Sequence, residues 1–151
     1  MPDNATIYIS DPSLLGSRLF DSIDIIQSYD GLLEDDTATG VFFDIGVAQV
    51  QMNFMPKEEL PQHLNGFLGY AEQMFSGNQD DLLYLLSRIR HVTFAMGCVI
   101  TPSFDQDGQA EGFLLEMTNR LNGLLFIYDS IVDYDGNPLT GPLAKQGSLA
   151  S

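Results

Sequence analysis

Two interleaved series of side chains run through residues 47–54 and constrain the fold more than any other stretch of the chain. One series is mainly polar and consists of Val47, Gln49, Gln51 and Asn53. The other is apolar throughout and consists of Ala48, Val50, Met52 and Phe54. Because successive side chains of a strand point to opposite faces of a sheet, this alternation predicts a half-buried β-strand, which ends before Pro56.

Strand and helix patterns follow one another along the rest of the chain. We expect further strands at 6–10, 40–45, 92–100 and 124–132, with a short edge strand at 138–143. A first helix is expected to begin at Asp11 and Pro12, because these residues suit the cap and the first helical position. Its apolar face would hold Leu15, Leu19, Ile23 and Ile26. Apolar stripes of helical period predict further helices over 60–75, 78–90 and 109–122.

This order of elements predicts an α+β fold. No repeat or linker divides the chain, so we expect a single acidic domain over 1–145, followed by a flexible C-terminal tail at 146–151. A mixed, mainly antiparallel sheet of about five strands, with three to four helices packed on one face of it, would bury each apolar stripe once.

The charge of the chain is strongly unbalanced. Its 151 residues include 21 acidic and 6 basic side chains, which gives a formal net charge of −15. The hydrophobic fraction of 44% is ordinary for a globular domain, so the acidity does not indicate disorder. Nucleic acids and anionic bilayers select Lys and Arg, so the charge argues against direct binding to nucleic acid or to a membrane.

Nothing in the sequence indicates export. Residues 1–5 contain no basic region, and no stretch approaches the ~18 apolar residues that cross a bilayer. The single cysteine, Cys98, lies in an apolar run, where we expect a buried and unreactive thiol. A cytoplasmic protein is the resulting expectation.

Two Asp-x-Asp-Gly strings, at residues 105–108 and 133–136, are candidates for cation binding. Neither has the glycine that an EF-hand loop needs at its sixth position, and turn chemistry explains both. Asp129, Asp133 and Asp135 remain as candidate metal ligands or acid–base groups.

The remaining reactive side chains do not form a recognisable catalytic pattern. His63 and His91 lack the spacing of a zinc site, and Cys98 has no base placed on its own strand face. We therefore expect no enzymatic activity and no cofactor.

Acidic side chains gather in residues 21–36 and 58–87, and neither stretch contains a Lys or Arg. Such surfaces steer basic partners during encounter, while apolar anchors supply most of the affinity. A solvated acidic surface that favours solubility is the alternative interpretation. The candidate partner-binding residues are Asp30, Leu32, Leu33, Glu34, Asp35, Asp36, Asp80 and Asp81.

The region from 41 to 132 combines a strand, Met55-Pro56, a helix, and a strand that opens at His91-Val92. With its size and acidity, the chain resembles small acidic bacterial immunity proteins, and also a bacterial α+β domain family of unknown function. The resemblance implies an antitoxin of interbacterial competition, a protein-binding toxin inhibitor that occludes the basic active site of a cognate toxin or effector.

Three other functions stay open. The chain could be an adaptor or structural subunit, which would associate through an apolar patch. It could be a phosphate-mimicking inhibitor of a nucleic-acid-binding protein, which would expose one continuous acidic face. It could also be a carboxylate or metal enzyme, in which Asp129, Asp133 and Asp135 would converge in a pocket.

Overall fold

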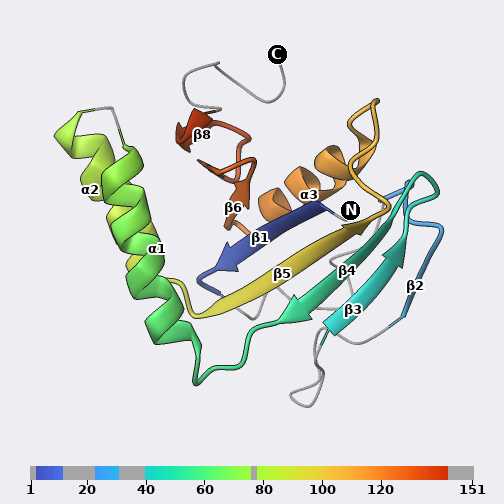
Figure 1. The fold of residues 1–151 in the computed structure, drawn as a ribbon, viewed down its shortest axis with the longest axis horizontal. Coiled ribbons are helices and arrows are strands. Elements are labelled where there is room, and N and C mark those ends of the chain that lie inside the picture. The colour runs from blue at the N-terminus through green and yellow to red at the C-terminus, as the bar shows by residue number, and fades with distance from the viewer. Residues whose placement is uncertain (1–2, 12–22, 31–39, 76–77, 143–151) are drawn as a thin grey trace.

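The computed structural model describes residues 3–11, 23–30, 40–75 and 78–142. In this part of the chain eight strands form one sheet in the order β2-β3-β4-β5-β1-β6-β7-β8 (Figure 1). Each neighbouring pair is antiparallel. The strands are β1 (Asp3–Ile9), β2 (Ser28–Asp30), β3 (Gly40–Asp44), β4 (Gln49–Phe54), β5 (Phe94–Thr101), β6 (Leu124–Ile127), β7 (Ser130–Val132) and β8 (Pro138–Thr140).

Strand β1 comes first in the chain but lies inside the sheet. It pairs with β5 from Asp3 to Ile9, along its whole length. With β6 it pairs only at Thr6, Ile7 and Tyr8. Strand β6 therefore pairs with the second half of β1 only, and the first half of β1 has β5 as its single strand neighbour among the described residues.

In the described residues, three helices cover parts of the two sheet faces: α1 (Leu60–Met74), α2 (Gln79–Arg90) and α3 (Gln109–Arg120). Phe113 and Met117 of α3 pack in one core cluster with Ala5, Ile7 and Ile9 of β1. Phe67 of α1 and Ile89 of α2 pack on the opposite face, in a cluster with Tyr8. Helices α1 and α2 lie side by side at one end of the strands (Figure 1).

The α+β class is confirmed, but the sheet differs from the expectation. It has eight strands in the described part of the chain rather than about five. Strand β2 has only three residues, too few for a periodic pattern, and the single strand expected over 124–132 is two strands, β6 and β7. The sheet is antiparallel at every pair rather than mixed. Helices pack on both faces, not on one.

The helices predicted from apolar stripes form where they were expected. In α2 the Asn78 side chain caps the first turn by accepting a hydrogen bond from the Asp81 amide at 2.9 Å. Asp80 and Asp81 lie in this first turn and Arg88 and Arg90 in the last, as the helix dipole favours. None of the helices in the described residues is long and apolar enough to span a bilayer.

The helix expected after Asp11 is not confirmed. Residues 12–22 lie outside the described part of the chain, as does the predicted tail at 146–151. The end of that expected helix is described and is not helical: residues 23–27 form a turn before β2. Ile23 and Ile26 still pack against the α3-side core. Their spacing therefore reflects burial of a non-helical segment and not a helix.

The strand expected over 124–132 is instead a tight hairpin. Strands β6 and β7 pair with each other, and Ile127 faces Ser130 across a two-residue turn made by Tyr128 and Asp129. Both turn residues have positive φ, at 52° and 59°, which is the backbone of a type I′ turn. Tyr-Asp lacks the glycine that usually marks such a turn, so the apolar run read as one strand.

Candidate functional site: an open sheet face that ends in a pocket

One end of the α1-side sheet face is uncovered by any described helix. Cross-strand register places Asp30, Phe42, Gln51, Val99 and Asn4 in one row across five strands. A row on each side completes this surface, which we call the open face. Its residues are Asn4, Thr6, Ser28, Asp30, Gly40, Phe42, Asp44, Gln49, Gln51, Asn53, Gly97, Val99, Thr101 and Phe126.

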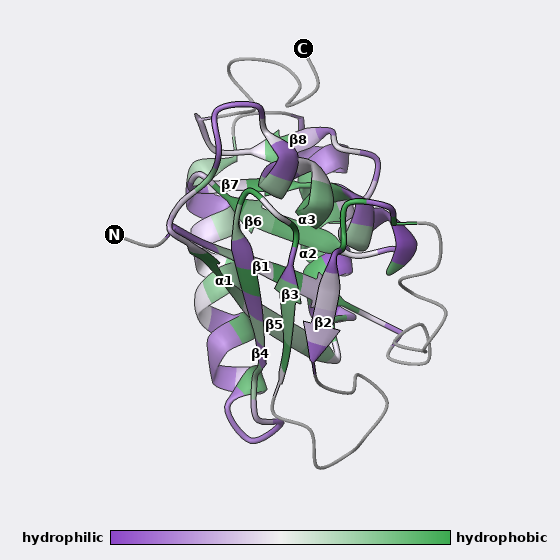
Figure 2. Ribbon diagram, turned by 90° about the vertical axis from the view of Figure 1, so that its right-hand side faces the viewer, coloured by the Kyte–Doolittle hydropathy of each residue, from purple (hydrophilic) through white to green (hydrophobic). Residues whose placement is uncertain are grey.

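The open face owes its exposure to the alternation in β4. Val50 and Met52 are fully buried on the α3 side, whereas Gln49, Gln51 and Asn53 are exposed, as the sequence predicted. This alternation is visible along β4 in Figure 2. The Gln51 Nε2 donates a hydrogen bond to Asn53 Oδ1 at 3.1 Å, so neighbouring amides order one another.

The chemistry of the open face is mainly that of amides and hydroxyls. No Lys or Arg belongs to it, and its two carboxylates, Asp30 and Asp44, lie on the outer strands β2 and β3. Phe42 is its one exposed ring, with 37% of its surface accessible. A surface of hydrogen-bonding groups around one aromatic ring suits contact with another macromolecule.

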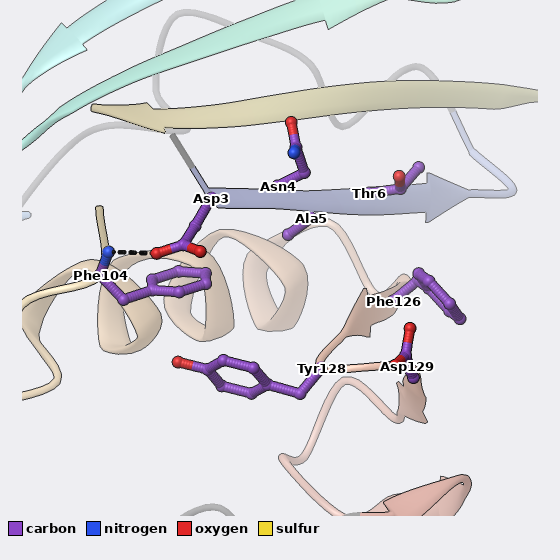
Figure 3. A pocket seen from close by; sticks show the side chains of 8 residues that line it. All are labelled: Asp3, Asn4, Ala5, Thr6, Phe104, Phe126, Tyr128 and Asp129. Atoms are coloured by element: carbon purple, nitrogen blue, oxygen red, sulfur yellow. Dashed lines mark hydrogen bonds between the residues drawn. The ribbon is translucent and has the colours of Figure 1, made fainter. Parts of the chain in front are cut away.

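A pocket of about 330 Å³ lies at the other end of the open face, where β6 leaves β1 (Figure 3). One wall is the first half of β1, from Asp3 to Thr6. Phe126, Tyr128 and Asp129 of the β6–β7 hairpin line the opposite wall, and Phe104 contributes from the loop between β5 and α3. The pocket therefore unites three segments that are far apart in the sequence.

The hairpin turn beside the pocket is held from three directions. The Tyr70 hydroxyl of α1 donates to the backbone oxygen of Asp129 at 2.5 Å, and the Tyr128 hydroxyl donates to Glu111 Oε1 of α3 at 2.6 Å. Gly141 lies so close to Asp129 O that a Cβ there would overlap it. Positive φ at a residue other than glycine costs of order 1 kcal/mol or more, and these contacts offset that strain.

Negative charge collects around Tyr128. Burial raises the pKa of this phenol well above its usual range, and the hydrogen bond to Glu111 raises it further, as does the negative charge of Glu111, Asp3 and Asp105. The hydroxyl therefore stays protonated and remains a donor at neutral pH. The same carboxylates give this end of the molecule a negative potential.

The loop that carries Phe104 is fixed by two carboxylates. Asp3 Oδ2 accepts from the Phe104 amide at 2.8 Å. Asp105 accepts from the amides of Gln109 and Ala110 at the start of α3, at 3.0 and 2.9 Å. Burial alone would raise the Asp105 pKa, but these backbone hydrogen bonds outweigh it and hold the pKa below its usual range.

The structure separates the predicted partner-binding residues. Asp30 is exposed at the end of β2 and belongs to the open face, whereas Asp80 and Asp81 are exposed on α2 at the opposite side of the molecule (Figure 1). Leu32, Leu33, Glu34, Asp35 and Asp36 lie outside the described residues. Asp30 and the α2 pair therefore cannot form one continuous patch.

The three candidate metal ligands also lie apart. Asp129 precedes β7, whereas Asp133 and Asp135 follow it, in the turn to β8. In the described ranges no group of three or more His, Cys, Asp or Glu side chains is placed to hold a metal ion. Asp129 lines the pocket, and Asp133 lies 4.0 Å from Arg88 in an ion pair.

Both Asp-x-Asp-Gly strings are turns, as predicted. In the second, the Asp133 amide donates to Asn137 O and the Gly136 amide donates to Asp133 O, each at 2.9 Å. Gly136 supplies the positive φ of 85° that this turn requires. In the first, the Asp105 carboxylate accepts from the Gln109 and Ala110 amides at the start of α3.

The histidines and the cysteine occupy structural positions. His63 Nε2 and the buried Tyr8 hydroxyl share a hydrogen bond of 2.7 Å, which ties α1 to the sheet. His91 Nδ1 lies 2.7 Å from Ser87 O at the end of α2. Cys98 is buried as expected, and burial raises the pKa of its thiol to about 12, so it is a poor nucleophile.

Sequence reasoning did not find the pocket. Its aromatic residues, Phe104, Phe126 and Tyr128, are indistinguishable from core residues in a strand or loop pattern. The one signal was the polar pair Asp129-Ser130, which interrupts the apolar run of 124–132.

No family model matches the chain, and neither curated proteins nor solved structures include a significant match to it. The resemblance to acidic immunity proteins therefore stays a prediction. Function has to be inferred from the geometry and charge of the molecule itself.

Proposed function

We propose that this chain is a non-catalytic binding domain for a basic protein, and that it acts as an inhibitor of the immunity-protein kind by covering its partner's basic active site. The observation that carries the proposal is the open face: an exposed sheet surface without Lys or Arg, in a chain of net charge −15. Asp30 and Asp44 stand at one end of this face, and Asp129 at the other.

Charge arithmetic supports a basic partner. Six basic side chains cannot neutralise 21 acidic ones, so most carboxylates have no cation of their own. A partner rich in Lys and Arg would meet a complementary field, which accelerates encounter and selects against acidic competitors.

The middle of the open face favours protein binding over phosphate mimicry. A mimic of nucleic acid needs carboxylates in a long series, whereas Gln49, Gln51 and Asn53 place amides there. Five strands at ~4.8 Å spacing span roughly 19 Å, so a standard interface of about 800 Å² per partner must also include the pocket and the flanking elements.

The experiment compares Gln51→Arg, in the middle of the open face, with Gln73→Arg, an exposed residue of α1, as the matched control. Tagged wild type and both variants are used to capture partners from native lysate at low and moderate salt. We expect one stoichiometric basic protein, retained by wild type and Gln73→Arg and lost by Gln51→Arg.

The purified partner is then assayed with and without the chain. Saturating amounts of wild type should abolish the partner's activity. The same amount of Gln51→Arg, used in place of wild type, should leave that activity unchanged. A partner whose activity is unchanged in the complex would identify an adaptor instead. A monodisperse bait that retains no basic protein would refute the proposal.

A further inference from the structure

The pocket has an unusual wall, because part of it is an unpaired strand edge. Among the described residues, Asp3–Ala5 of β1 pair with β5 on one side only, since pairing with β6 stops at Thr6. Backbone polar groups on the other side of this segment therefore face the pocket instead of a strand. A ligand that enters can use main-chain acceptors as well as side chains.

Aromatic rings form two further sides of the pocket. The Phe104 and Tyr128 rings lie with centroids 5.2 Å apart and planes at 53°. Phe126 lines the pocket from β6, and its ring also packs against Phe67 and Tyr70 of α1. Ring faces attract organic cations, and the attraction is strongest where water is partly excluded.

The charge in the pocket is negative and unbalanced. Asp3 and Asp129 both line it, and Glu111 and Asp105 act on Tyr128 from behind. Among the described residues no Lys or Arg lines the pocket, and none forms an ion pair with Asp3 or Asp129. The ligand that this environment favours is therefore a cation.

A bare metal ion does not suit this arrangement. Metal ions of the calcium and magnesium kind need several converging oxygen ligands, which the described residues do not provide here. Aromatic walls contribute no ligands to such an ion but do favour a flat, weakly hydrated organic cation.

We propose that the pocket binds the guanidinium group of an arginine side chain, which the basic partner inserts at the end of the open face. Assigning the arginine to that partner rests on the proposed function. Guanidinium fits better than ammonium because it is planar, stacks on aromatic rings, and presents several donors in one plane. The carboxylates of Asp3 and Asp129 line the pocket as acceptors for those donors, although Asp3 Oδ2 also accepts from the Phe104 amide, and the aromatic lining offers a ring for the guanidinium plane.

The braced hairpin makes the pocket ready for this ligand. The Asp129 turn is fixed by Tyr70 and Gly141, and Tyr128 is fixed by Glu111, before anything binds. A wall that is already ordered loses little conformational entropy on binding, so even a small cationic group is captured.

The test is an NMR titration of the folded chain with three blocked tripeptides, acetyl-Gly-X-Gly-amide, in which X is arginine, lysine or citrulline. Citrulline is nearly isosteric with arginine but uncharged. We expect saturable shifts of the Asn4, Thr6, Phe104 and Asp129 amides with arginine, weaker binding with lysine and none with citrulline. Equal binding of citrulline and arginine, or no shift at these amides, would overturn the assignment.

Two variants separate the pocket from general charge attraction. Asp129→Asn removes one carboxylate and keeps a residue that tolerates the left-handed turn, and Asp80→Asn removes the same charge on α2. We expect Asp129→Asn to weaken arginine binding by about fivefold and Asp80→Asn to leave it unchanged. Equal weakening by the two variants would show attraction to net charge and would refute the site.

A third arm decides the source of the cation. Spermidine is titrated under the same conditions, because a free polyamine offers a competing cation. Tighter binding of spermidine than of the arginine peptide at the pocket amides would overturn the arginine assignment. These titrations need no partner, so a failed pocket and a failed partner capture are separate results.

Discussion

The same sheet face is buried at one end of its strands and exposed at the other. In β1, Tyr8 is only 2% exposed beneath α1, whereas Asn4 at the other end of the strand is exposed. In β5, Ala95 is fully buried, whereas Thr101 is exposed. The sequence changes along each strand, from apolar residues under the helices to hydroxyls and amides beyond them.

This difference separates stability from recognition. The covered end stabilises the fold because burial of apolar surface contributes roughly 25 cal/mol per Å². The open face buries little apolar surface of its own. Its side chains can therefore vary to suit a binding partner with little change in the free energy of unfolding. Substitutions at the two ends should therefore have very different effects on stability.

The largest expected effect is at the covered end. Phe67 stacks on Tyr8 with ring centroids 4.3 Å apart and is 7% exposed, so Phe67→Ala should lower the free energy of unfolding by about 3–4 kcal/mol. Gln51→Ala on the open face should change it by less than ~0.5 kcal/mol. Urea denaturation monitored by circular dichroism measures both. A loss above about 1 kcal/mol for Gln51→Ala would mean that the side chains of the open face contribute substantially to the stability of the fold.

The contrast also explains which parts could be predicted from the sequence. Each of β4, α1 and α2 buries one of its faces, so its apolar residues recur with the period of a strand or a helix. These local patterns predicted the three elements, and the structure confirmed them. The β6–β7 hairpin could not be predicted, because Tyr128 and Asp129 adopt positive φ only with support from α1, α3 and Gly141. That support is tertiary, so no local pattern records it, and the pocket was missed with the hairpin.

A second prediction tests whether the uncovered end is nevertheless rigid at its pocket. Gly141 and Gly136 have similar φ, 92° and 85°, but only at Gly141 would a Cβ overlap neighbouring atoms, those of Asp129 and Ser130. Gly136→Ala should therefore cost about 1 kcal/mol from backbone strain alone, and Gly141→Ala about 2–3 kcal/mol. Thermal and urea unfolding give the two values. Equal costs would show that the hairpin shifts to make room, and the pocket would then not be preformed.

The smallest effect concerns the loop that carries the pocket residue Phe104, and it depends on pH. Asp105→Ala removes the carboxylate that accepts from the first two amides of α3, and should lower the free energy of unfolding by about 1 kcal/mol at neutral pH. Asp107→Ala, two residues away, is the control and should have little effect.

The sign of the pH dependence follows from the lowered pKa of Asp105 in the folded state. Its contribution is complete above the unfolded-state pKa of about 3.8 and is lost as the pH falls through the lower, folded-state value. The difference between wild type and Asp105→Ala should therefore be constant from pH 7 to 5 and shrink below pH 3.8. Urea unfolding at a series of pH values measures this difference. A difference that grows on acidification would mean that the folded state raises the Asp105 pKa. The hydrogen bonds from the α3 amides to Asp105 would then not be what holds the loop that carries Phe104.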